Sequence, residues 1–141
     1  MIRFCITISL LFVVACGAPD DEQELRDTIT KMQAAGEAGE RRKFMQFVAD
    51  DFRGQGYDRD SLANMIRIQL LQSQKVGATT TNVEITIFDG GRATANIRTL
   101  LTGGAGWLPD RGQLYDIESG WRKDGSDWLL ISARWEPSLG G

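Results

Sequence analysis

The pattern of hydrophobic and polar positions changes its period near Gly77. Before this glycine, apolar residues recur every three or four positions, as on one face of an α-helix. After it they alternate with polar residues, as in half-buried strands. Because helices precede long antiparallel strands, the pattern predicts an α+β domain with N-terminal helices packed on one side of a strongly curved antiparallel sheet.

Three helices are predicted before the change of period. The first covers residues 21–37 and the second covers residues 40–48. Residues 50–54 are expected to form a short strand or a turn. Asp58 should then cap a third helix, which ends near residue 75.

The first predicted hairpin follows Gly77 and turns at residues 89–91, which read Asp-Gly-Gly. A loop of these three residues places apolar side chains together on one face of the two strands. The pairs on that face are Ile87 with Ala93, Ile85 with Ala95, and Val83 with Ile97.

The second predicted hairpin turns at residues 124–126, which read Asp-Gly-Ser. Its apolar pairs are Trp121 with Leu129, Ser119 with Ile131, Ile117 with Ala133, and Tyr115 with Trp135. The charged face has Asp116 across from Arg134 and Glu118 across from Ser132.

The first residues of the chain predict export. Arg3, an apolar run over residues 4–15 and a small residue at the cut are the parts of a secretory signal peptide. The run is too short for a membrane-spanning helix, which needs about 20 apolar residues. Residues 13–16, Val-Val-Ala-Cys, resemble the lipobox of bacterial lipoproteins, in which the cysteine becomes the acylated first residue. The alternative is an ordinary signal peptide with a chance cysteine.

The lipobox resemblance implies lipid, palmitate included, on Cys16 and a membrane-anchored protein on the periplasmic or other extracytoplasmic side. Residues 1–15 would be the signal peptide, 16–21 a lipidated tether, 22–137 the domain and 138–141 a flexible tail. The residue after the cysteine is glycine rather than the aspartate that retains lipoproteins in the inner membrane of enteric bacteria. The outer membrane is therefore favoured if the cell has one.

Composition limits the partners and the chemistry. The chain has 16 Lys and Arg against 19 Asp and Glu, and loss of Arg3 with the signal peptide would make it more acidic. Nucleic acid is therefore not expected as a partner. The sequence has no histidine and two cysteines, Cys5 in the signal segment and Cys16. Ser-His-Asp and Cys-His catalysis are excluded, and no metal or cofactor is expected.

The order of elements carries a second resemblance. Helices, a short strand and a capped helix precede a sheet that ends in Trp121-Arg122-Lys123, a turn, Trp128 and Trp135. This order is similar to the nuclear transport factor 2-like (NTF2-like) superfamily, which includes SnoaL-like proteins and ketosteroid isomerases. The resemblance implies a cone of bent sheet closed by helices, often with an internal pocket and often dimeric through the outer sheet face. Some members use a pocket aspartate as a base, and many are noncatalytic.

One group of charged residues is a candidate ligand-binding site. It consists of Asp116, Glu118 and Arg134, with Arg98 and Glu84 on the neighbouring hairpin. On a concave face, Arg134 could keep Asp116 ionised while Glu118 acted as an acid or base. On a convex face, the same charges would form solvated cross-strand pairs. We expect the convex arrangement, with Glu118 largely exposed.

The four tryptophans differ in their expected roles. Trp107 lies in a glycine-rich loop, where it could cover the mouth of a pocket, contact a partner or the membrane interface, or anchor the loop to its own domain. Trp121, Trp128 and Trp135 lie on predicted strands and are expected in the core or at an interface.

These observations predict a lipoprotein whose domain is a small-molecule-binding or scaffold module. Its expected partners are the membrane, through the lipid, and in addition a second copy of the chain or a small apolar ligand. One alternative is a small isomerase or cyclase that uses Asp116 or Glu118. Another is an envelope interaction protein that dimerises through its sheet. An apolar cavity would favour ligand binding, a buried unpaired carboxylate would favour an enzyme, and a filled cone would favour a scaffold.

Overall fold

The computed structural model describes residues 19–72, 76–103 and 112–138. The elements, in chain order, are α1 (Pro19–Glu37), α2 (Arg41–Met45), β1 (Val48–Gly54), β2 (Tyr57–Asp58), α3 (Arg59–Gln72), β3 (Val76–Phe88), β4 (Arg92–Gly103), β5 (Gln113–Asp124) and β6 (Asp127–Pro137). The predicted lipidation site at Cys16 and the loop residue Trp107 lie outside the described residues.

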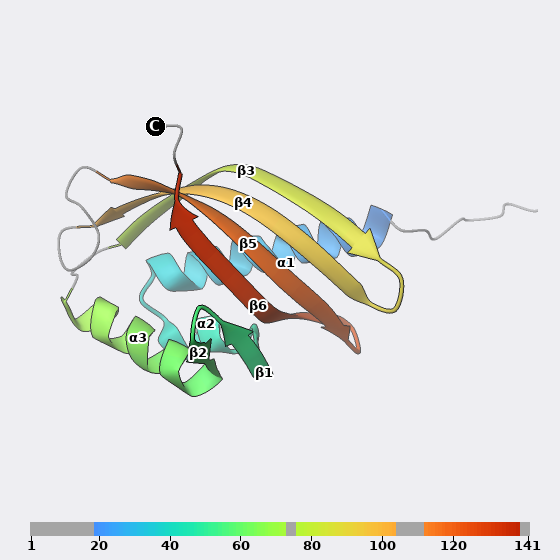
Figure 1. Cartoon of the computed structure of the whole chain (residues 1–141), viewed down its shortest axis with the longest axis horizontal. Coiled ribbons are helices and arrows are strands. Elements are labelled where there is room, and N and C mark those ends of the chain that lie inside the picture. Colours follow the sequence, from blue (N-terminus) through green and yellow to red (C-terminus); the bar gives the residue numbers. More distant parts are fainter. Residues whose placement is uncertain (1–18, 73–75, 104–111, 139–141) are drawn as a thin grey trace, which may run out of the picture.

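The strands form one six-stranded sheet in the order β2-β1-β6-β5-β4-β3. All neighbouring strands are antiparallel except β1 and β6, which are parallel. Figure 1 shows β3 to β6 curving over α1. The prediction of an α+β domain, with helices on a strongly curved and mostly antiparallel sheet, is confirmed. Among the described helices, none has the length and apolarity needed to cross a membrane.

Helix α1 begins at Pro19, two residues before the predicted start, and ends at Glu37 as predicted. Its buried face consists of Leu25, Ile29, Met32 and Ala35, which recur at helical spacing. These side chains join a core that includes Phe52, Trp121 and Trp128. The helix therefore covers the inner face of the sheet along an apolar stripe.

Helix α2 is shorter than the predicted helix over 40–48, because it ends at Met45. The backbone carbonyl of Phe47 accepts a hydrogen bond from the backbone N–H of Leu130 at 2.7 Å. Val48, which is buried, then begins β1 alongside β6. Pairing with the sheet thus takes the place of the last helical turn expected from the sequence.

Helix α3 begins as predicted, with Asp58 as its cap. The Asp58 carboxylate accepts a hydrogen bond from the Ser61 backbone N–H at 2.8 Å, and the Ser61 hydroxyl accepts one from the Asp58 N–H at 2.9 Å. This reciprocal pair satisfies backbone donors at the helix start. The Ser61 N–H also lowers the pKa of Asp58 below its ordinary value, because it stabilises the carboxylate.

The register of the β3–β4 hairpin is the predicted one. Ile87 pairs with Ala93, Ile85 with Ala95, and Val83 with Ile97. The predicted register of the β5–β6 hairpin is wrong. Trp121 pairs with Leu130, Ser119 with Ala133, Ile117 with Trp135, and Tyr115 with Pro137.

Two local features cause the shift in the β5–β6 hairpin. Asp124 pairs with Asp127, so the turn holds two residues instead of three, and Gly125 adopts a positive φ of 65° within it. Farther from the turn, Ile131 is an extra residue in β6, because Gly120 pairs with Ser132 while Trp121 pairs with Leu130. Beyond the turn and the extra residue, each residue of β5 pairs with a residue of β6 two positions later than the predicted one.

The chain after β6 is also more ordered at its start than predicted. Ser138 was assigned to a flexible tail, but it is buried, and its N–H donates to the Leu114 carbonyl at 2.8 Å. The remaining residues of that tail, 139–141, lie outside the described residues.

Candidate functional site

A cavity of about 340 Å³ lies between the helices and the inner face of the sheet. Its walls come from α1, α2, α3 and the strands β1, β3, β4, β5 and β6. The lining is predominantly apolar and includes Ile29, Met32, Phe44, Leu62, Trp121 and Trp135. The cone of the sheet is therefore not filled by side chains among the described residues.

Gln33 of α1 joins the helix to β3 at the cavity. Its amide nitrogen donates to the Ala78 carbonyl at 2.9 Å and to the Glu37 carboxylate at 3.0 Å. Its amide oxygen accepts a hydrogen bond from the Thr80 hydroxyl. These bonds use the polar atoms of Gln33 within the protein and fix α1 against strand β3.

Ser119 and Trp121 form a buried polar link on β5. The indole N–H of Trp121 donates to the Ser119 hydroxyl at 2.9 Å, and that hydroxyl donates to the Ala95 carbonyl at 2.8 Å. Ser119 is 3% exposed and Trp121 is 2% exposed. The two bonds hold the indole in place in the cavity wall and leave neither side chain short of a partner.

Glu37 is the one carboxylate among the described residues that line the cavity. It is exposed and accepts the hydrogen bond from Gln33. A catalytic acid or base needs a pKa near neutrality, which in a carboxylate usually comes from burial away from partners. The described lining therefore holds no carboxylate with the surroundings expected of a catalytic group.

The predicted charged site lies on the opposite, convex face of the sheet. Asp116 and Glu118 extend from β5, and Arg134 extends from β6. Together with Arg98 and other polar residues they line a depression of about 420 Å³. The structure thus brings the predicted charged residues together, but away from the apolar cavity.

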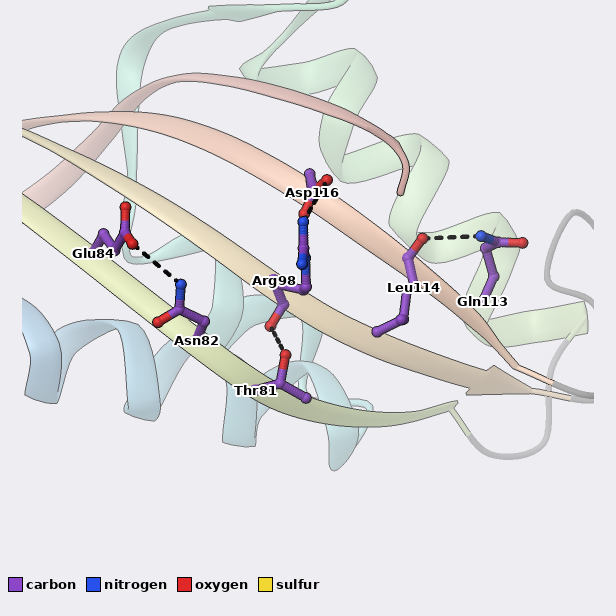
Figure 2. A network of polar contacts seen from close by, with 7 residues as sticks. All are labelled: Thr81, Asn82, Glu84, Arg98, Gln113, Leu114 and Asp116. Atoms are coloured by element: carbon purple, nitrogen blue, oxygen red, sulfur yellow. Dashed lines mark hydrogen bonds and ion pairs between the residues drawn. The ribbon is translucent and has the colours of Figure 1, made fainter. Parts of the chain in front are cut away.

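The pairing within this charged group differs from the prediction. Arg134 contacts Glu118 at 3.0 Å, not Asp116, because of the shifted β5–β6 register. Asp116 is paired with Arg98 of β4, whose guanidinium donates to both carboxylate oxygens at 2.7 and 3.3 Å. Figure 2 shows these two side chains pointing toward one another from neighbouring strands.

The guanidinium of Arg98 holds the pKa of the Asp116 carboxyl below its ordinary value, because the hydrogen bonds stabilise the charged form. A lowered pKa keeps Asp116 ionised at neutral pH and makes it a poor general base. Its side chain is 42% exposed, so water screens the pair. The expected convex arrangement is the observed one.

Glu118 has the predicted exposure, with 63% of its side chain accessible, although its pairing with Arg134 was not predicted. We expect Glu118→Gln to change the free energy of unfolding by less than about 0.5 kcal/mol, as is usual for exposed residues. Urea unfolding followed by circular dichroism measures this change. Glu136→Gln, on the same face, is the matched control, and a loss well beyond that of the control would contradict the expectation.

Comparison with solved structures identifies the fold of the domain. Bd1075 of Bdellovibrio bacteriovorus matches with a TM-score of 0.74 and 13% identity, over 82% of this chain and 41% of that chain. The chain thus spans about two fifths of that protein. A proposed dehydratase from the NTF2-like family of Streptomyces avermitilis matches with a TM-score of 0.75 and 16% identity, over 87% of this chain and 100% of that chain.

An NTF2-like protein of Pseudomonas putida matches with a TM-score of 0.73 and 16% identity, over 84% of this chain and 87% of that chain. The chain has the NTF2-like fold. No family model and no curated protein matches its sequence. The predicted resemblance is therefore confirmed at the level of the fold, while the reaction or ligand of the NTF2-like domain has to be inferred from its own residues.

Sequence reasoning did not identify the cavity residues as a site. Trp135 lines the cavity and stacks on Tyr57 of β2, with ring centroids 6.0 Å apart. Gln69 of α3 also lines it. The available signal was the position of Gln69 within the apolar stripe of the third helix, where a polar side chain is unexpected.

Proposed function

We propose that this protein is a membrane-anchored extracytoplasmic lipoprotein whose NTF2-like domain binds a small, predominantly apolar molecule. The observation that carries the proposal is the cavity of about 340 Å³ with its apolar lining. Ligand sites usually have volumes of about 300–1,000 Å³, apolar walls and a few polar groups that orient the ligand. The cavity meets each of these criteria.

The binding function is better supported than an acid/base enzyme. The proposed dehydratase from Streptomyces avermitilis shares the fold, but removal of water from a substrate needs a group that moves protons. Within the described lining, the exposed and hydrogen-bonded Glu37 is the one carboxylate. Asp116 and Glu118, the carboxylates that the enzyme alternative would use, lie on the other face of the sheet and are ion-paired there.

A purely structural role through the outer face is also less well supported. That face carries exposed ion pairs between Arg98 and Asp116 and between Arg134 and Glu118. The centre of a stable protein interface is usually depleted of charged residues. Binding in the cavity makes use of a feature that a scaffold does not require.

The lipid on Cys16 would place the cavity close to a bilayer, because only two residues separate this cysteine from Pro19, where α1 begins. A chain of this length extends by only about 3.3–3.6 Å per residue. Apolar molecules partition into bilayers, so a domain held at the surface could exchange such a ligand with the membrane. If the cell has an outer membrane, the glycine after Cys16 favours that location.

Binding can be tested with the chain that starts at Gly17, which contains every described helix and strand. We expect 2-methylnaphthalene to bind and to raise the melting temperature, since ligand at about 100 times its Kd stabilises the folded state by about 2.7 kcal/mol. Ala78→Phe adds a ring in the cavity wall and should weaken binding about tenfold or more, which corresponds to about 1.4 kcal/mol.

Ala34→Phe is the matched control, because Ala34 lies on the exposed side of α1 and the same ring is added outside the cavity. It should bind the probe as the unchanged domain does. Calorimetric titration of the three proteins measures the affinities. Equal weakening by both substitutions, or no binding by the unchanged domain, would contradict the proposed function.

A further inference from the structure

Gln69 interrupts the apolar face that α3 presents to the cavity. The helix contributes Leu62, Met65, Ile66 and Gln69 to the lining, at the spacing that places side chains on one helical face. The first three are apolar. A polar amide therefore occupies a position at which the helix otherwise carries hydrocarbon.

The side-chain carbonyl oxygen of Gln69 is buried and, within the part of the chain that the structure describes, has no hydrogen-bond donor. Such an atom has lost its hydrogen bonds to water without replacement, which carries a free-energy penalty. An apolar residue at this position would avoid the penalty. The cost is explained if the donor comes from a bound molecule.

The other amide, hydroxyl and carboxylate side chains of the described lining have internal partners. Gln33 and Thr80 bond to each other, Thr99 donates to the Thr79 carbonyl, and Ser119 lies between Ala95 and Trp121. These groups are already satisfied. Among the buried polar atoms of the described lining, the Gln69 carbonyl oxygen is thus the one that lacks a partner within the described part of the chain.

We propose that Gln69 is the specificity-determining residue of the cavity and selects a neutral apolar molecule that carries a hydroxyl group. This inference rests on the proposed binding function. A hydroxyl group can donate to the Gln69 carbonyl while the rest of the molecule contacts the apolar walls. A carboxylate is disfavoured, since the described lining contains no Lys or Arg and includes the carboxylate of Glu37.

The ligand class can be tested with three probes that share one ring system and differ in a single substituent. They are 2-naphthol, 2-methylnaphthalene and 2-naphthoate, titrated calorimetrically into the chain that starts at Gly17. We expect 2-naphthol to bind about tenfold more tightly than 2-methylnaphthalene, since it pairs a buried acceptor. We expect 2-naphthoate to bind more weakly than either neutral probe.

Gln69→Leu should remove the preference for 2-naphthol and leave the affinity for 2-methylnaphthalene unchanged or higher. It should also raise the melting temperature of the unliganded domain, because an unsatisfied buried acceptor is removed. A merely structural glutamine would give a lower melting temperature. Gln69→Met is a second variant without the carbonyl. Asn64→Leu, which removes an exposed amide from the same helix outside the cavity lining, is the control that should keep the preference.

The outcomes separate the two proposals. Equal binding of 2-naphthol and 2-methylnaphthalene by the unchanged domain would overturn the role of Gln69 and leave cavity binding intact. A preference that persists in Gln69→Leu and Gln69→Met would do the same. Failure of both neutral probes to bind would overturn the ligand class and the proposed function together.

Discussion

Replacing Trp121 with alanine is expected to lower the free energy of unfolding by about 3–5 kcal/mol. The indole is 2% exposed, belongs to the main core cluster and forms part of the cavity wall. Its removal would enlarge the cavity and would take the indole N–H away from the Ser119 hydroxyl. Because small domains are stable by only about 5–15 kcal/mol, this loss should bring the protein close to unfolding.

Urea unfolding followed by far-ultraviolet circular dichroism measures the loss as a lower midpoint. Trp121→Phe retains most of the apolar contact and should cost less than the alanine substitution. Ile68→Ala is the surface control, because Ile68 is 39% exposed. The Trp121→Ala midpoint should lie far below the Ile68→Ala midpoint. If the two substitutions lower the midpoint equally, the indole does not stabilise the core.

The β3–β4 hairpin could be predicted residue by residue because two independent signals agree. Val83, Ile85 and Ile87 alternate with polar residues, and a three-residue turn of Asp89, Gly90 and Gly91 joins the strands without a further irregularity close to it. A shift by one residue would turn the apolar face outward. The burial pattern therefore selects a single register.

The β5–β6 hairpin lacks this agreement. Residues 128–131 read Trp-Leu-Leu-Ile, so apolar side chains occupy both faces of β6 and alternation cannot choose between registers. The bulge at Ile131 then changes which face each later residue occupies. As a result the charged partners were predicted wrongly, although the exposure of Glu118 was predicted correctly.

The residues that line the cavity could not be predicted from the sequence, for a different reason. Helical spacing places Gln69 on the inner face of α3, but the space beside it depends on the curvature of the whole sheet and on where β1 joins β6. The pattern at residues 40–48 predicted helix where Val48 starts that strand. Long-range pairing of this kind leaves no periodic signal in the local sequence.

Replacing Cys16 with serine is expected to abolish lipid attachment. The proposed anchor forms through the cysteine thiol, so a hydroxyl at this position leaves no acceptor for the diacylglycerol group. An anchor with two or more acyl chains binds membranes stably, at about 0.8 kcal/mol for each buried methylene. The unchanged protein, produced in a bacterial host and labelled with an alkyne analogue of palmitate, should therefore carry the label and sediment with membranes.

Cys5→Ser is the matched control, since Cys5 lies in the predicted signal peptide and should not appear in the mature protein. This variant should retain the label, whereas Cys16→Ser should lose it. Mass spectrometry of the N-terminal peptide gives a second measurement, because the proposed cut makes Cys16 the first residue. Label that persists in Cys16→Ser, or a mature chain that begins at another residue, would rule out the lipid anchor and leave the binding domain to act without one.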